Sequence, residues 1–291
     1  MRMKKIYLLL IIVFVNFYGE LKAQEIIPFR MNGHYNIIVK SLINEKDSID
    51  LMFQIAMQDA SLAPNRKKKV ESIKFDTSEF SEGLSKVNTI QVANTKIDSI
   101  WIWDNEYTGY EAEGKIGTQL FKGKIFKINY DHSQFELYDE LPVTEGFVQI
   151  PLNVKRGQLF VNISSFIGSK EIYNEFLLQS GFSGAIIYNN QISDENHLSQ
   201  NLLQLEEKTM SNSAGQKLTN LICRLPDLKI AGFEFKDIPV GIFTGEIKNQ
   251  PTSYMGADLI HRFNWIFDTK AKVAYIQKNK YFEDQYYFNK K

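Results

Sequence analysis

The sequence predicts an all-β protein with two related lobes, and three observations lead to this fold class. First, β-branched and aromatic residues gather in short runs that polar turns separate, which is typical of strands. Second, few stretches repeat apolar residues at helical spacing. Third, the order of segments in the first half of the chain recurs in the second half, which indicates an internal repeat.

The strands are expected in a regular order along the chain. A first pair is predicted in "HYNIIVKSLI" (34–43) and "SIDLMFQIAM" (48–57), which the polar residues "NEKD" separate. The segment "DSIWIW" (98–103) alternates in the manner of a strand. The segment "KIFKINYDHSQFELYD" (124–139) predicts two strands joined by a polar turn. Residues 157–189 then repeat the arrangement of the first pair.

Two segments depart from the strand pattern. The best helical candidate is "ISDENHLSQNLLQLEEK" (192–208), in which Leu198, Leu202 and Leu205 have suitable spacing. The last residues, "YFEDQYYFNKK" (281–291), are rich in aromatic side chains but stand at the terminus. We expect this tail to be frayed.

The internal repeat has two parts. Residues 25–62 recur in outline as residues 146–187, since each segment has an apolar residue and proline, a strand, a polar turn, a second strand and a loop with glutamine. Residues 115–131 likewise match residues 254–270, and a glycine opens a short leucine-containing segment before a strand in both. The repeat predicts two lobes that meet near "ELPVTEG" (140–146).

The N-terminal segment has the pattern of a secretory signal. Basic residues come first, an apolar run from Ile6 to Phe17 follows, and a polar stretch ends at Ala23. The apolar run is short for a membrane span. We therefore expect an exported protein, periplasmic or extracellular, with no integral membrane span in the mature chain. The expected division is a signal peptide, a first lobe and a second lobe, at residues 1–23, 24–145 and 146–291.

The composition favours large cores and gives no sign of a nucleic-acid partner. The chain has 291 residues and 44% hydrophobic content, enough for two ordinary domains. Its 34 basic and 34 acidic residues leave a formal net charge of zero, so no overall field would attract nucleic acid or an anionic membrane. The basic run "NRKKK" (65–69) is expected to be a solvated loop.

Cysteine and histidine give no reason to expect a cofactor or a metal. Cys223 is the single cysteine, so no intrachain disulfide can form, and it is expected to be a small buried hydrophobe. The histidines lie far apart in the sequence, at His34, His132, His197 and His261. The oligomeric state is left open.

At the repeated loops the chain resembles the aspartic protease clan (clan AA), particularly the bilobal pepsin-like and retropepsin-like proteins of Bacteroidetes-type bacteria. In that family an apolar strand leads into Asp-Thr/Ser-Gly, and a later apolar-apolar-Gly segment packs beside the loop. Here "EFLLQSGFSGAII" is similar to the second loop, with Gln179 in the Asp position. "LMFQIAMQDASL" is similar to the first, with Gln54 in the Asp position and Ile55 and Ala56 replacing Thr and Gly. "GKIGTQLF" and "SYMGADLI" match the later glycine segments.

The resemblance implies two pseudo-symmetric β-barrel lobes with a central cleft. The two glutamines, however, lead us to expect no catalysis. In the family two neighbouring carboxylates share one proton and act as acid and base. The amides of Gln54 and Gln179 do not titrate, and general acid–base catalysis by one positioned group is worth about 10² to 10⁴-fold. No catalytic residue is therefore expected, and the chain is interpreted as a pseudoprotease. Its remaining capability would be to bind an extended peptide or a cell-envelope partner between the lobes.

Candidate binding residues come from two segments. Ser180 and Gly181 are retained after the second glutamine, where a glycine suits a close backbone approach and a hydroxyl can brace the turn. In the family a hairpin flap covers the cleft, and the resemblance assigns "WIWDNEYTGY" (101–110) to that flap. Tyr107 and Tyr110 are the flap-tip candidates.

Two alternatives remain open. The chain could be an active aspartic-type endopeptidase with an unrecognised acid pair, for which Asp59 is the nearest candidate acid. It could also be a structural module whose cleft is filled by side chains such as Met52, Met57 and the neighbouring tryptophans.

Overall fold

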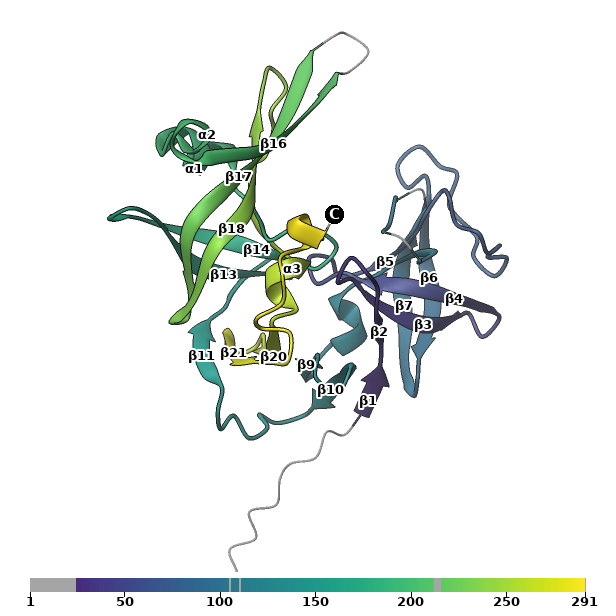
Figure 1. Ribbon diagram of the computed structural model, residues 1–291. Coiled ribbons are helices and arrows are strands. Elements are labelled where there is room, and N and C mark those ends of the chain that lie inside the picture. The colour runs from purple at the N-terminus through teal and green to yellow at the C-terminus, as the bar shows by residue number, and fades with distance from the viewer. Residues whose placement is uncertain (1–24, 105, 110, 212–215, 291) are drawn as a thin grey trace, which may run out of the picture.

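The computed structural model describes residues 25–104, 106–109, 111–211 and 216–290 (Figure 1). The predicted signal peptide (1–23) and Tyr110 lie outside the described residues. Three β-sheets make up most of the described chain. The predicted all-β class with two barrel-like lobes is therefore confirmed.

A seven-stranded sheet forms the first barrel, which we call lobe one. Its strand order is β2-β3-β4-β8-β5-β7-β6, and an additional pairing of β3 with β6 closes the sheet on itself. Most buried side chains of β3 and β6 are isoleucine, valine or leucine, as a half-buried strand favours, and the buried polar exceptions are Ser41, Ser85 and Asn88. The strands are β2 (Arg30–Met31), β3 (Ile37–Ile43), β4 (Asp47–Phe53), β5 (Ala60–Leu62), β6 (Leu84–Val92), β7 (Thr95–Trp103) and β8 (Gly114–Ile116).

An eight-stranded sheet forms the second barrel, lobe two, in the order β12-β13-β14-β19-β15-β18-β17-β16, and it closes through a pairing of β13 with β17. Its strands are β12 (Asn153–Lys155), β13 (Gln158–Ile167), β14 (Lys170–Gln179), β15 (Ile186–Ile187), β16 (Leu203–Ser211), β17 (Lys217–Ile230), β18 (Phe233–Thr244) and β19 (Ser253–Gly256).

The predicted helix over 192–208 is only half correct. Two short helices, α1 (Asn190–Glu195) and α2 (Leu198–Asn201), occupy its first part, and the Asn189 side chain caps α1 by accepting a hydrogen bond from Ile192 N. From Leu203 onward the chain is strand β16 instead. The reason is tertiary, because β16 pairs along its length with β17 and gains a ladder of hydrogen bonds that outweighs the helical spacing.

A six-stranded sheet joins the two lobes, in the order β1-β10-β9-β20-β21-β11. Its two central strands, β9 and β20, come from opposite halves of the chain, and Phe126 stacks on Phe267 across them with ring centroids 4.8 Å apart. The strands are β1 (Glu25–Pro28), β9 (Ile125–Asn129), β10 (Gln134–Tyr138), β11 (Val148–Pro151), β20 (Phe263–Asp268) and β21 (Val273–Lys278).

The two lobes repeat one pattern of strand pairing, as the internal repeat predicted. In lobe one β4 runs parallel to β8, while β5 is antiparallel to β8 and parallel to β7. In lobe two β14, β19, β15 and β18 pair in the same way. A short helical turn follows the equivalent strand in each lobe: η1 (Thr118–Phe121) after β8, and α3 (Ala257–Ile260) after β19.

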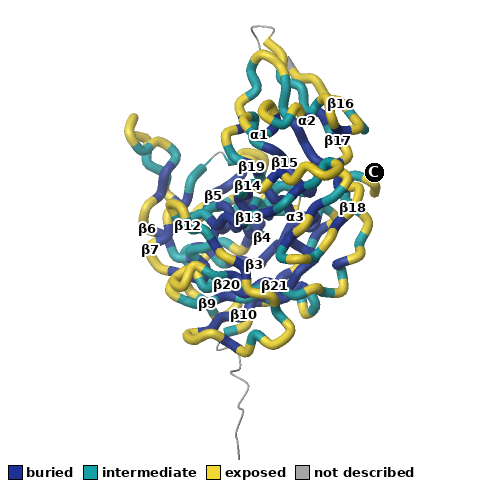
Figure 2. Tube along the Cα trace, turned by 90° about the vertical axis from the view of Figure 1, so that its left-hand side faces the viewer, coloured by how far each residue is buried: buried dark blue, intermediate teal, exposed yellow. Residues whose placement is uncertain are grey.

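The C-terminal tail is packed, so the expectation that it is frayed was wrong. Phe282 is buried against Phe233, Phe235 and Phe263, and its backbone oxygen accepts a hydrogen bond from Arg262. The tail ends in a short turn, η2 (Tyr287–Lys290), drawn in yellow beside α3 (Figure 1). Buried residues gather around α3 and the strands next to it (Figure 2). Aromatic burial therefore fixes a segment that its terminal position alone would leave free.

Candidate functional site

The two glutamine loops stand at equivalent places in the two lobes. Gln54 follows β4 directly, and its backbone N–H donates to Ile116 O on the parallel strand β8. Gln179 is the last residue of β14, where it pairs with Gly256 of the parallel strand β19. Each glutamine therefore lies where a buried strand opens into a loop, next to the glycine-containing segment of its own lobe.

Both loops lie against glycines that leave no room for a side chain. A Cβ atom on Gly117 would come within 2.4 Å of Met57 O, and one on Gly256 would come within 2.1 Å of Gly184 O. The backbone torsion φ at these glycines is −98° and −92°, values open to any residue. The requirement for glycine is thus one of space: each loop packs backbone against backbone.

Ser180 connects the two loops across the lobe boundary. Its Oγ donates to Phe53 O and accepts from Ile55 N, with both distances 3.0 Å. Ser180 is 2% exposed, so these hydrogen bonds are shielded from water. The reciprocal pair of bonds, from lobe one to lobe two, would need a hydroxyl at position 55, where isoleucine stands. Of the two symmetric pairs of hydrogen bonds that could join the loops, only the pair made by Ser180 can therefore form.

A second pair of cross-lobe hydrogen bonds was not predicted from the sequence. Asn36 Nδ2 donates to Ser180 O at 2.8 Å, and Gln158 Nε2 donates to Ala56 O at 3.1 Å. Extending the antiparallel registers of β3–β4 and β13–β14 places Asn36 and Gln158 at equivalent positions, each opposite its lobe's loop glutamine. Aligning the repeats at those strand starts would have revealed the amide pair.

The predicted site residues Gln54, Gln179, Ser180 and Gly181 come together in the structure. A Cβ atom added to Gly181 would lie 2.7 Å from Gln54 Oε1, so the lobe-one amide rests against the lobe-two backbone. On the other side, Gly181 N lies 3.4 Å from Gln179 Oε1 as a long hydrogen bond. Both glutamines are partly exposed to solvent. Their carboxamides can donate and accept hydrogen bonds but cannot exchange protons with a substrate.

Asp59 does not form an acid pair with a neighbour. Burial raises the pKa of its carboxyl, and a hydrogen bond from Trp103 partly opposes that shift. Two carboxylates that shared a site would perturb each other strongly. No second carboxylate contributes to the pKa of Asp59 within the described chain.

Tyr107 lies on a connection rather than on a hairpin. The segment 104–113 joins β7 to β8, and these strands pair with other partners and not with each other. Tyr107 is 76% exposed, while Gly109 on the same segment lies close to Met52 and Asn36. The expected hairpin at this place is therefore wrong, although the segment does reach the residues around the glutamine loops.

His261, at the end of α3, packs against lobe one. Its ring stacks on Tyr35 with centroids 3.9 Å apart and an angle of 11° between the planes. Nδ1 lies 2.9 Å from Ala257 O and must donate to it, since a carbonyl oxygen can only accept. Nε2 is buried without a hydrogen bond in the described chain and faces Asp284 Oδ2 at 3.7 Å. Burial, with the nearby Arg262 charge, lowers the pKa of His261 to about 4.

We expect folding stability to fall as pH decreases from about 6.5 to about 4. In the unfolded chain His261 takes up a proton near pH 6.5, whereas in the folded protein it does so only near pH 4. The stability that neutral, buried His261 contributes is therefore fully present above this pH range. The loss amounts to about 3 kcal/mol. Urea unfolding at a series of pH values measures it. His261→Asn keeps a donor for Ala257 O and does not titrate, so its stability should vary less over the window. An equally steep loss in the variant would contradict the assignment.

The sequence analysis also made predictions about a metal site, about Cys223 and about membrane-spanning segments. Among the residues that the structure describes, no group of three or more His, Cys, Asp or Glu side chains could hold a metal ion. Cys223 is buried in the lobe-two core, and burial raises its pKa, as expected of a small hydrophobe. No described helix is long and apolar enough to span a bilayer.

The structure is similar to two solved structures, one of which is an aspartic proteinase. The aspartic proteinase from Irpex lacteus superposes with a TM-score of 0.55 and 10% sequence identity, over 89% of this chain and 98% of that chain. Basic 7S globulin from soybean gives a TM-score of 0.49 and 8% identity, over 90% of this chain and 97% of that chain. No family model and no curated protein matches the sequence. The likeness to the proteinase shows a shared bilobal all-β fold.

Proposed function

We propose, from the premise that the chain has the fold of an aspartic proteinase, that it is an exported pseudoprotease that binds extended peptides between its lobes. One observation carries the proposal. Gln54 and Gln179, at the ends of equivalent strands, come together around Gly181, where a proteinase of this architecture would need its acid pair. Carboxamides at this place can hold a peptide group without cutting it.

The surroundings of the glutamines support binding rather than chemistry. Cross-lobe bonds from Ser180, Asn36 and Gln158 hold the two loops in a fixed relation. A rigid floor of this kind lowers the entropic cost of holding a ligand. Asp59, the nearest alternative acid, has no carboxylate among the groups that shift its pKa in the described residues. An endopeptidase with an unrecognised acid pair therefore has less support.

A structural role is the second candidate, and one observation favours it. Ala56 of lobe one packs in a small apolar cluster with Phe160 and Leu177 of lobe two, and Tyr254 lies against it. This cluster fills part of the space beside the glutamine loops. If it extended over the whole boundary between the lobes, no room for a peptide would remain.

The test of the proposed function combines binding and cleavage. We expect the wild-type protein to retain members of an unbiased peptide library and to cleave none of them from acid to neutral pH. The double variant Q54D/Q179D should gain slow cleavage at acid pH that a statine-type transition-state mimic inhibits, because the acid pair is restored on an unchanged backbone. Circular dichroism of both proteins controls for folding.

Two outcomes would contradict the proposal. Cleavage by the wild-type protein that the mimic inhibits would favour an active endopeptidase. No retention of any peptide would favour the structural module.

A further inference from the structure

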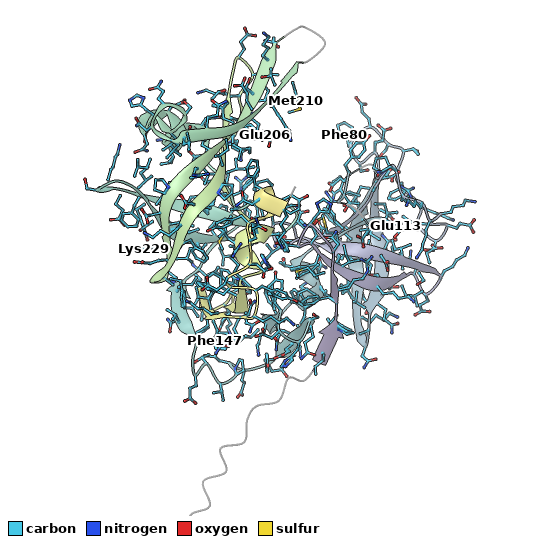
Figure 3. All side chains as sticks on the ribbon, viewed as in Figure 1. Phe80, Glu113, Phe147, Glu206, Met210 and Lys229 are labelled. Carbon is cyan, nitrogen blue, oxygen red and sulfur yellow. The ribbon has the colours of Figure 1, made fainter. Side chains whose placement is uncertain are left out.

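Lobe two has a pocket beside the residues that directly follow Gln179. Its volume is about 340 Å³, and it is lined by residues 181–186, by strands β16, β17 and β18, and by Tyr287 and Phe288 of the tail. Phe182, Ile222 and Pro239 give it apolar walls. Glu206 on β16 forms part of the rim, below Met210 on the same strand (Figure 3). The pocket therefore adjoins the proposed peptide site.

The strand registers show which lobe-one residue corresponds to the pocket floor. In lobe one β5 pairs with β7, and Ser61 lies opposite Trp103. In lobe two β15 pairs with β18 in the same parallel sense, and Ile187 lies opposite Gly241. The pairings of β5 with β8 and of β15 with β19 fix how the two lobes align. In each lobe the residues are counted back from the equivalent glycine, Gly117 before η1 or Gly256 before α3. Trp103 and Gly241 are thus equivalent.

At this equivalent position lobe one has a tryptophan and lobe two has a glycine, which explains why lobe two has a pocket there. In lobe one the position carries Trp103, whose indole lies near enough to the Asp59 carboxyl to lower its pKa against the effect of burial. In lobe two Gly241 has no side chain, and a Cβ atom there would lie 3.2 Å from Ile187 and 3.4 Å from Asn220 Oδ1. The position that carries an aromatic side chain in lobe one therefore carries no side chain in lobe two, where Gly241 lines the pocket.

The pocket also has an acceptor that matches the role of Asp59. Asn220 lines the pocket, and its Oδ1 is buried without a hydrogen-bond partner among the described residues. A buried amide oxygen that has lost water and gained no donor costs free energy. A ligand group that brought an N–H or O–H would remove that cost.

We propose that this pocket receives an aromatic side chain that carries a hydrogen-bond donor, that of Trp or Tyr, from a peptide bound between the lobes. The inference rests on the proposed function for the peptide, but the pocket itself can be tested without one. The ring would lie between Phe182, Ile222 and Pro239, and its donor would reach Asn220 Oδ1. Gly241 provides the space, and Asn220 selects for the donor.

The test uses blocked amino acids as probes of the pocket. Binding of N-acetyl-tryptophanamide, N-acetyl-tyrosinamide, N-acetyl-phenylalaninamide and N-acetyl-leucinamide is measured by saturation-transfer NMR at millimolar concentration. We expect the Trp and Tyr probes to bind, Phe to bind about fivefold more weakly than Tyr for want of one hydrogen bond, and Leu not to bind detectably. Gly241→Trp should abolish binding by filling the space. Asn220→Ala should remove the preference for Tyr over Phe.

Matched controls use the symmetry of the chain. Gly33→Trp introduces the same side chain at a glycine with no atom within 4 Å, so it should leave probe binding unchanged. Trp103→Gly should create a second site for the tryptophan probe, with Asp59 as its acceptor. If Gly241→Trp fails to fold, Asn220→Ala still tests the selection for a donor.

Each result bears on the pocket separately from the proposed function. Probe binding that Gly241→Trp leaves intact, or equal binding of Tyr and Phe, would overturn the pocket assignment. If library peptides bind and Gly241→Trp does not weaken them, the pocket proposal fails while the proposed function stands. If the probes bind as expected and no peptide is retained, the pocket is supported and the proposed function fails.

Discussion

Replacing Gly256 by alanine is expected to destabilise the protein by about 3 kcal/mol or more, close to the upper range for overpacking. The new Cβ would lie 2.1 Å from Gly184 O and 2.7 Å from Phe182 O, and both are backbone atoms that cannot rotate away. Relief requires the loop after Gln179 to move. That movement would break the bonds from Gly256 N to Ala185 O and from Ala257 N to Phe182 O.

Urea unfolding followed by tryptophan fluorescence measures this effect, with soluble yield as the readout if the variant does not fold. Gly33→Ala is the matched control, since a Cβ there has open space, and it should be nearly neutral. Gly117→Ala tests the same packing in lobe one, because its Cβ would meet Met57 O at 2.4 Å. A change within about 0.5 kcal/mol for Gly256→Ala, the range of ordinary surface substitutions, would show that the loop does not pack as described.

Replacing Ser180 by alanine is expected to cost about 2 to 4 kcal/mol, because it leaves two buried partners unsatisfied. Phe53 O would lose its donor and Ile55 N would lose its acceptor. Ser180 is 2% exposed, so water cannot readily replace the hydroxyl. The two lobes would lose a direct connection at the glutamine loops, and we expect peptide binding to weaken as well.

The free energy of unfolding and the affinity for a retained library peptide are the two measurements. Ser183→Ala, in the same loop but more exposed, is the control and should change stability by less than about 0.5 kcal/mol. A loss from Ser180→Ala no larger than that of Ser183→Ala would mean that the cross-lobe hydroxyl does not hold the loops together.

Local patterns sufficed to predict the fold class and the repeat. Alternating apolar residues and polar turns specify strands, and the repeated glycine and glutamine positions, at Gly117 and Gly256 and at Gln54 and Gln179, mark the same place in each lobe. The structure brings Gln54, Gln179, Ser180 and Gly181 together as the repeat implied. Such features lie within short segments, where sequence periodicity and local geometry are directly coupled.

Features that depend on partners distant in the chain could be found only from the tertiary structure. Leucine spacing favoured a helix through Leu205, yet β16 exists because it pairs with β17. The tail is ordered by burial of Phe282 against lobe two, which no terminal pattern indicates. The equivalence of Trp103 and Gly241 appears only once strand registers are known. The sequence by itself determined the class of fold and the presence of a glutamine in each of the two repeated loops. The packing of distant segments decided which side chains fill space and which leave a pocket, because pairing and burial energies depend on neighbours that the local sequence does not contain.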